Sequence, residues 1–316
     1  MDVEVAAQCA CRLGESPTWH APTESLFWAD IVGGALYRLP PHGPHEVVAS
    51  GLLVSGISVQ DDHSLLLLGR SGRVRTLRAG EIATLRRGSV RWVGYRFNDC
   101  IADPAGRVLA GVMNHPVDLS GWENLSRVRG KLRRLGVIRH PAGHRGLLSR
   151  LAGNGRPVPL IKGLWRPNGM AFSPRADVLY VTESGRRRIL AFPYDVASGA
   201  LGPARVLVDC SSESGVPDGL VTDSEGCLWS ARNKAGLIVR YADDGRTLER
   251  ISLPTTGVTS LTFGGRHLRD LYVTTARTAS AAPADELAGA VFRLSTDVEG
   301  GTVYRSRLGL PGAVYD

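Results

Sequence analysis

Four short motifs in this chain each place an oxygen-bearing side chain beside Gly, Pro or Asp, a few residues before an apolar run. They are Leu13-Gly14-Glu15-Ser16-Pro17, Arg96-Phe97-Asn98-Asp99, Arg166-Pro167-Asn168-Gly169 and Val216-Pro217-Asp218-Gly219. Pro-Asn-Gly and Pro-Asp-Gly are ordinary turn formers, because Asn and Asp tolerate a left-handed backbone and Gly adopts it freely. Carboxylate and amide oxygens are also the ligands that hard divalent cations prefer. Each motif alone fits a turn; together they suggest a metal site.

The charges of the candidate side chains favour a divalent ion. Glu15 and Asp218 would neutralise two positive charges, and Asn98 and Asn168 would add amide oxygens. Ca²⁺ is the expected ion, with Mg²⁺ and Mn²⁺ as alternatives. Zn²⁺ is a further alternative because carboxylates bind it, although the sequence shows no Cys or His cluster for it.

These four side chains meet only if an internal repeat brings them together. A turn-like cluster followed by a short apolar run recurs six times, with landmarks at Leu26, Leu65, Val108, Leu179, Leu228 and Leu271. The landmarks are 39, 43, 71, 49 and 43 residues apart, and four of these spacings approach the length of a four-stranded propeller blade. The sequence therefore predicts an all-β, six-bladed β-propeller over residues 1–316, in preference to a pair of β-sandwiches.

The four motifs share one position in this repeat. Glu15, Asn98, Asn168 and Asp218 each precede the landmark of their blade by about ten residues. Because the first strand of a propeller blade lines the central channel, equivalent positions lie at similar heights around it. We therefore expect these side chains from blades one, three, four and five to surround one point in the channel.

Charge and composition restrict the remaining choices. The net charge is +8, and residues 127–150 hold eight Lys or Arg and no Asp or Glu. We interpret the basic stretch, about 114–150, as an insertion between blades three and four. Residues 127–150 contain no Phe, Trp or Tyr on which a base could stack, so no nucleic-acid partner is expected. An acidic small molecule is an alternative partner, attracted by this charge.

No membrane partner is expected, since no apolar stretch approaches the length needed to cross a bilayer. The start of the chain shows no secretory signal, so we expect a cytoplasmic protein. The five cysteines fit neither a disulfide framework nor a zinc site, and we interpret them as unpaired thiols: Cys9, Cys11, Cys100, Cys210 and Cys227. No Gly-x-Ser-x-Gly elbow, phosphate loop or dinucleotide fingerprint is present, so no organic cofactor is expected.

The motifs together resemble the SMP-30/gluconolactonase/luciferin-regenerating-enzyme family of six-bladed propellers. To the four motifs the likeness adds Asp223-Ser224-Glu225-Gly226-Cys227-Leu228-Trp229 and Leu271-Tyr272-Val273-Thr274. The resemblance implies that Glu15, Asn168 and Asp218 hold the metal and that Asp218 is also the catalytic acid/base. It further implies that Arg96 and Asn98 contact substrate, and that Asn98 joins the metal shell in some relatives.

This chain also departs from the family pattern beside the expected site. After Met113 the sequence reads Asn114-His115-Pro116, where sugar-lactonase relatives carry a substrate-binding Glu. We therefore expect His115 and Glu123 to contact the substrate from the basic segment. This departure puts a simple aldonolactone substrate in question.

The expected function is metal-dependent hydrolysis of a lactone to its hydroxy acid. A bound cation would polarise the carbonyl group, and Asp218 would assist the attack of water. One alternative is a metal-stabilised propeller that acts as a binding or regulatory module without turnover. Another is a tailoring enzyme for a larger acidic metabolite.

Overall fold

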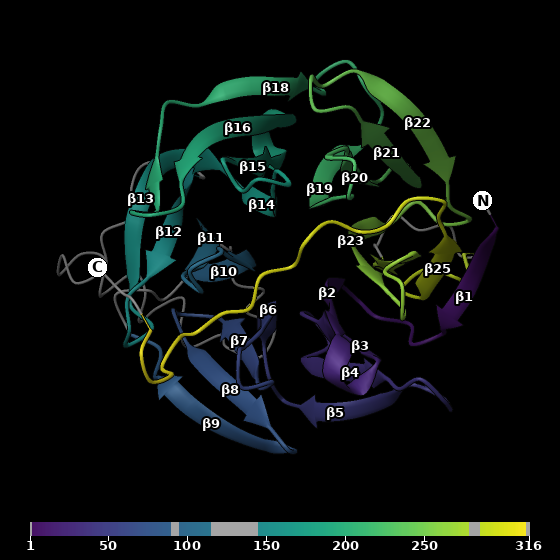
Figure 1. The fold of residues 1–316 in the computed structure, drawn as a ribbon. Helices are drawn as coiled ribbons and strands as arrows, with labels where there is room; N and C mark the ends of the chain where they lie inside the picture. Colours follow the sequence, from purple (N-terminus) through teal and green to yellow (C-terminus); the bar gives the residue numbers. More distant parts are fainter. Residues whose placement is uncertain (1, 90–94, 115–144, 278–284, 314–316) are drawn as a thin grey trace, which may run out of the picture.

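Six antiparallel sheets surround a central channel in the computed structural model, which describes residues 2–89, 95–114, 145–277 and 285–313 (Figure 1). Blade one contains β2 (Gly14–His20), β3 (Ser25–Asp30), β4 (Ala35–Leu39) and β5 (Glu46–Ser50), with the short 3₁₀ helix η1 (Ala21–Thr23) after β2. Blade two contains β6 (Val54–Val59), β7 (Leu65–Gly69), β8 (Val74–Arg78) and β9 (Glu81–Arg86). Blade three contains β10 (Tyr95–Ala102), β11 (Val108–Asn114), β12 (Arg145–Leu151) and β13 (Pro157–Trp165).

Blade four contains β14 (Pro167–Phe172), β15 (Val178–Glu183), β16 (Arg188–Asp195), β17 (Ala200–Leu201) and β18 (Arg205–Asp209), with η3 (Ser184–Arg186) after β15. Blade five contains β19 (Val216–Thr222), β20 (Leu228–Asn233), β21 (Leu237–Tyr241) and β22 (Thr247–Ser252). Blade six contains β23 (Val258–Gly264), β24 (Asp270–Thr275) and β25 (Val291–Ser295). Its fourth strand is the N-terminal β1 (Val3–Ala7), which pairs with β25 and closes the ring. The predicted six-bladed propeller is confirmed.

The apolar landmarks mark the second strand of every blade. Each lies at the first or second residue of β3, β7, β11, β15, β20 or β24. These strands are covered on both sides by the neighbouring blades, and β7, for example, is buried at every residue. The outer strands face solvent, and β9 is exposed at nearly every residue. A continuous apolar run therefore identifies the second strand of a blade, because both faces of that strand are buried.

The core is divided into six layers, one between each pair of neighbouring blades. Between blades five and six, for example, Trp229 packs with Phe263 and Phe292, and the Trp229 and Phe263 rings meet edge to face at 5.7 Å. Corresponding clusters join the other five pairs of blades. Each blade thus buries its two faces against two neighbours, so the ring is stable only when closed.

The position of the basic segment differs from the prediction. Strands β12 and β13 follow the segment but belong to the same sheet as β10 and β11. Residues 115–144 therefore connect the second and third strands of blade three and are not an insertion between blades three and four. The 71-residue spacing alone could not distinguish these positions, because both lie between consecutive landmarks. Residues 145–150 are part of β12.

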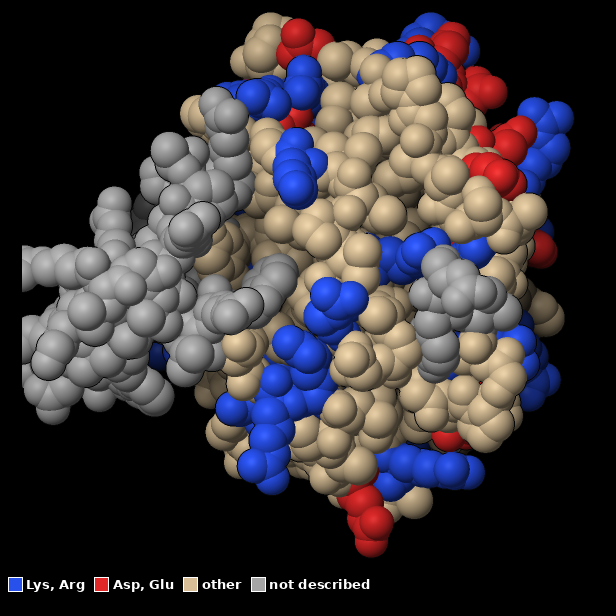
Figure 2. All heavy atoms as spheres, turned by 90° about the vertical axis from the view of Figure 1, so that its left-hand side faces the viewer, with Lys and Arg blue, Asp and Glu red and all other residues tan. Residues whose placement is uncertain are grey.

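Positive charge gathers on one side of the described molecule. Figure 2 shows Lys and Arg side chains in the middle of the face that carries β12 and β13, whereas Asp and Glu lie toward its edges. None of the helices in the described ranges is long and apolar enough to cross a membrane.

A C-terminal strap, residues 296–313, crosses one end of the channel (Figure 1). It contacts blade five where Gly301 donates its N–H to Thr222 O at 2.9 Å. It reaches blade two where Ser306 donates its N–H to Val59 O at 2.8 Å, and Leu308 is buried against blades two and three. Since these contacts lie at the carboxyl ends of the inner strands, the strap covers the end of the channel opposite the strand starts.

Candidate metal centre and hydrolytic site

A β-bulge in the first strand of each blade aims side chains at the channel. The register shifts by one residue between Glu15 and Thr18 in blade one, and corresponding shifts occur in all six inner strands. Asn98, Asn168 and Asp218 lie in the bulges of blades three, four and five. A bulge releases a residue from the ladder and redirects its side chain. Asn98, Asn168 and Asp218 therefore occupy equivalent places around the channel, whereas Glu15 pairs with Ala29 directly before the bulge of blade one.

Hydrogen bonds connect consecutive bulges around the ring. Ser16 Oγ donates to Ser55 O at 3.1 Å, and Ser55 Oγ donates to Phe97 O at 2.6 Å. Asn98 Nδ2 donates to Pro167 O at 2.9 Å, and from blade six Thr259 Oγ1 donates to Gly14 O at 2.5 Å. These bonds hold the inner strands at fixed heights, which fixes the relative positions of the candidate ligands.

Asn168 and Asp218 are in direct contact. Asn168 Nδ2 donates to Asp218 Oδ1 and, at 3.2 Å, to Ser184 Oγ. The other carboxylate oxygen of Asp218 accepts from Asn233 Nδ2 at 3.0 Å. Both Asn168 and Asp218 are at least nine-tenths buried. The two predicted ligands from blades four and five are thus in contact, and Ser184 and Asn233 hold their side chains in place.

Glu15 faces the same point from blade one. Burial and the negative charges of Asp218 and Asp99 raise the pKa of Glu15 well above its usual range. Burial likewise raises the pKa of Asp218 to about 7, against the opposing influence of Asn233, Arg166 and Arg96. Burial is the first cause of both shifts, so the site disfavours two carboxylates that lack a neutralising partner.

Two buried carboxyl groups that repel each other fit a bound cation. Among the described residues, Glu15 forms no ion pair, and its side chain is only partly exposed. A divalent ion would stabilise both carboxylates, and the amide of Asn168 would add a neutral oxygen after a change in its orientation. The donor set contains oxygen only, which suits Ca²⁺, Mg²⁺ or Mn²⁺.

Arg96 and Asn98 form a fixed pair in the channel wall. Arg96 Nη1 donates to Asn98 Oδ1 at 2.6 Å and to Phe97 O at 3.0 Å. Both side chains are more than nine-tenths buried. Burial lowers the pKa of Arg96 to about 10, although Glu15 and Asp218 oppose this effect. The Nε atom of Arg96 has no hydrogen-bond partner in the described part of the chain, so the guanidinium retains an unused donor.

Three supporting residues lay outside the sequence prediction. Asn233 ends β20, and Ser184 begins η3, directly after β15. Asp99 follows Asn98 in the bulge, and burial raises its pKa to about 6. The chain reads Arg232-Asn233-Lys234 and Glu183-Ser184-Gly185, which differ too much to form a repeated signal. Only the pairing of first and second strands brings these residues to the site.

Two predicted substrate contacts, His115 and Glu123, lie outside the described residues. The structure does describe the residues on either side of their segment, Asn114 and Arg145. Asn114 pairs with Tyr95 at the start of β10, and Arg145 pairs with Trp165 at the end of β13. Residues 115–144 therefore leave and rejoin blade three at the end of the blade that carries Asn98.

Neither the cysteines nor a second acidic cluster in blade five offers a better metal site among the described residues. All five cysteines are free, as predicted. Asp223, Glu225 and Cys227 lie close together, but Arg240 Nη2 contacts both carboxylates at 2.6 Å. That cluster is already neutralised by an arginine, so we assign it a structural role.

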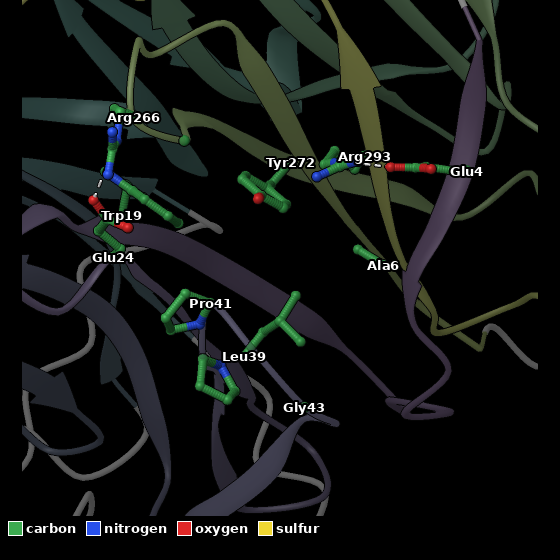
Figure 3. Close-up of a pocket in the computed structure, with 12 residues that line it drawn as sticks. Glu4, Ala6, Trp19, Glu24, Leu39, Pro41, Gly43, Arg266, Tyr272 and Arg293 are labelled. Carbon is green, nitrogen blue, oxygen red and sulfur yellow. Dashed lines mark hydrogen bonds and ion pairs between the residues drawn. The ribbon is translucent and has the colours of Figure 1, made fainter.

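The channel is also distinct from a second cavity on the rim. A pocket of about 310 Å³ lies between blades one and six, and Figure 3 shows Trp19 and Tyr272 lining it. Their rings stack at 5.8 Å, and the nearby Arg293 pairs with Glu4. Because its aromatic and charged groups already have partners, we place the chemistry in the channel.

Comparison with known proteins agrees with this geometry. Residues 13–277 match the family model described as the SMP-30/gluconolactonase/LRE-like region. The chain is 38% identical to a pentonolactonase of Haloferax volcanii, over 98% of this chain and 100% of that protein. It is 33% identical to a 6-deoxy-6-sulfogluconolactonase of Pseudomonas putida, over 95% of this chain and 92% of that protein.

A solved structure shares the fold. It is described as a calcium-binding protein, regucalcin, from Agrobacterium tumefaciens, and superposes with a TM-score of 0.80 at 24% identity, covering 96% of both chains. The family model spans most of the chain, including the four motifs with Glu15, Asn98, Asn168 and Asp218. The chain therefore belongs to the SMP-30/gluconolactonase/LRE-like family.

Proposed function

We propose that this protein is a metal-dependent lactonase that opens a cyclic ester to its hydroxy acid. The observation that supports this most is the contact between Asn168 and Asp218 in the channel, together with the buried carboxyl groups of Asp218 and Glu15, which repel each other. Curated relatives at 38% and 33% identity are named as lactonases, which agrees with the proposal.

The proposed roles follow from the positions of the side chains. Glu15, Asn168 and Asp218 would hold a divalent cation, with Ca²⁺ as our first choice in view of the calcium-binding structural relative. When bound, such an ion acts as a Lewis acid toward a carbonyl oxygen. Arg96 would donate its unused N–H to a substrate oxygen. Asn98, Arg96, His115 and Glu123 stay predicted substrate contacts.

Asp218 would act as the proton carrier of the reaction. One oxygen would take a proton from the attacking water as the new bond to the carbonyl carbon forms. The ring C–O bond then breaks, and the same carboxyl group returns the proton to the leaving alkoxide. Asn233, donating to Asp218 Oδ2 at 3.0 Å, would keep the carboxylate oriented during both transfers.

The larger acidic metabolite stays a second candidate because one observation favours it. Six of the eight basic residues lie within 127–144, in the segment that leaves and rejoins blade three at the end that carries Asn98. A positive field there would attract an anionic substrate. The cytoplasmic location stays a prediction.

The proposal is tested with stripped protein and one substitution. Treatment with EDTA should abolish hydrolysis of a lactone panel, and addition of Ca²⁺, Mg²⁺, Mn²⁺ or Zn²⁺ in turn should identify the ion that restores it. Asp218→Asn should lower kcat by at least about 100-fold, the typical share of a general base.

Asp244→Asn, in an exposed turn of blade five, is the matched control and should keep wild-type kinetics. Hydrolysis can be followed with a pH indicator, since opening of a lactone at neutral pH releases a proton. Full activity of Asp218→Asn would exclude the proposed base. If the metal binds but no lactone is opened, the protein is a binding module.

A further inference from the structure

The arginine that immediately precedes β14 combines three unusual features. Arg166 has φ +54°, in the left-handed region, although it carries a full side chain and stands directly before Pro167. A residue before proline is normally pushed toward extended backbone, and the left-handed region crowds Cβ. Strain of this kind persists where the surrounding structure enforces it, and it concentrates at functional sites.

The surrounding structure does hold this backbone in place. Arg166 O accepts the N–H of Ser184 at 3.1 Å, and Ser184 also contacts Asn168. The strained residue is thus tied to the same support as a candidate metal ligand. Arg166 and Asn168 are only two residues apart, so the position of one is coupled to that of the other.

The Arg166 guanidinium is exposed and has no hydrogen-bond or ion-pair partner among the residues that the structure describes. Its neighbours differ in this respect. Arg186 and Arg188 both pair with Glu183, at 3.0 and 2.6 Å, and Arg187 donates to Glu213 O. Within the described ranges, Arg166 therefore differs from these nearby arginines in having no acidic partner or carbonyl acceptor.

Arg166 stands directly before β14, two residues from Asn168. Its exposed side chain therefore starts at the end of the channel that carries the candidate ligands. Its exposure distinguishes it from the buried Arg96, which belongs to the channel wall.

We propose that Arg166 is a specificity residue that binds an anionic substituent, a carboxylate or sulfonate, on the part of the lactone remote from the reacting ester. This inference rests on the proposed lactonase function and narrows its substrate class. The planar guanidinium offers paired N–H groups that match the two oxygens of such an anion. The constrained backbone limits where the side chain can reach, which is how a subsite selects position as well as charge.

The test compares two lactones that differ in one group. Glucono-1,4-lactone ends in a neutral hydroxymethyl group, and glucaro-1,4-lactone ends in a carboxylate at the same carbon. For Arg166→Asn, the ratio of KM for glucarolactone to KM for gluconolactone should rise by about 10-fold to 100-fold, the usual value of a charged hydrogen bond. Asn tolerates the left-handed backbone, so the variant should keep its fold, checked by its melting temperature.

Two further variants sharpen the comparison. Arg166→Lys keeps the charge without the planar fork and should show an intermediate ratio. Arg175→Asn removes an arginine from an exposed turn of the same blade, where its side chain is 86% exposed, and should leave the ratio within about twofold because exposed distant charges are screened. An unchanged ratio in Arg166→Asn would overturn the proposal. An equal rise for both lactones would also overturn it, because it would indicate a contact with the reacting end.

Binding of the open-chain acids separates this proposal from the lactonase function. Titration calorimetry with gluconate and glucarate needs no turnover. If the wild-type protein opens neither lactone, the proposed function fails, while a preference for glucarate that is lost in Arg166→Asn still supports the anion subsite. The same preference in the variant and the wild type, or no preference in either, would refute the subsite.

Discussion

At the scale of single residues, the site is defined by three buried carboxyl groups and by the groups that orient them. Burial raises the carboxyl pKa values of Glu15, Asp99 and Asp218. Burying carboxylates without a neutralising partner costs stability, which is the physical basis for the proposed cation. Asn233 contributes differently, because it donates to Asp218 Oδ2 without adding charge.

We expect Asn233→Ala to lower kcat by about 10-fold to 100-fold with little change in KM, because a displaced catalytic group loses its alignment. The measurement is the kinetics of the metal-loaded protein on its best lactone. Asn154→Ala, in an exposed turn of blade three where Asn154 caps Arg156 N, is the matched control. A variant with wild-type kcat would show that Asp218 is oriented without Asn233.

At the scale of elements, short polar connections join neighbouring blades. Asp103 accepts from Arg107 Nε at 2.6 Å and from Tyr194 OH at 2.6 Å, which ties blade three to blade four. His20 has a similar role between blades one and two. Its Nε2 lies 2.9 Å from His63 O, and its Nδ1 lies 2.7 Å from Thr23 Oγ1. The His63 carbonyl only accepts, so His20 donates from Nε2, and a neutral ring then accepts the Thr23 hydroxyl at Nδ1.

Burial lowers the pKa of His20 from 6.5, and the charges of His63, Arg305 and Arg38 act in the same direction, although the hydrogen bond to His63 O opposes them. The folded state therefore binds fewer protons than the unfolded state, so the contribution of His20 to stability falls as pH drops below about 6.5. We expect His20→Gln to be less stable than wild type at pH 8 and the difference to shrink at pH 5.

Urea unfolding at both pH values measures that difference. His267→Gln removes an exposed histidine of blade six and controls for the loss of a histidine as such. A stability gap for His20→Gln that stays constant or widens in acid would contradict the neutral assignment.

At the scale of the whole molecule, two segments close the ring of blades: the N-terminal strand β1 and the C-terminal strap. Strand β1 completes blade six by pairing with β25, and the strap connects blades five and six to blades two and three across the channel. At the strap end of the channel, a cavity of about 260 Å³ is lined by inner strands and by the strap residues Thr302, Val303 and Tyr304. Because the strap lies at the opposite end from Asp218, we expect it to close the ring and to take no part in the reaction.

We expect Leu308→Ala to lower the free energy of unfolding by about 2–5 kcal/mol, the usual cost of truncating a buried leucine. Leu308 is 2% exposed, whereas Val303 in the same strap is 63% exposed. Val303→Ala should therefore change stability by less than about 0.5 kcal/mol. Chemical unfolding measures both changes, and lactone kinetics should be unaltered in each variant. A fall in kcat for folded Leu308→Ala would show that the strap takes part in the reaction.

The sequence by itself determined the number of blades and the places of the candidate ligands. Both follow from local signals: turn residues and doubly buried apolar runs recur with each blade, and Glu15, Asn98, Asn168 and Asp218 hold one phase of that repeat. These local patterns can be recognised in the sequence because every blade repeats the same order of turn residues and apolar strands.

Only the tertiary structure decided which side chains touch. The contact of Asn168 with Asp218 and the support from Asn233 depend on how neighbouring blades and paired strands meet. The placement of residues 115–144 inside blade three depended on strand pairing, as did closure by β1 and the strap. Each of these contacts joins residues that are far apart in the chain. Such partners are set by the closure of the ring, so no local sequence pattern specifies them.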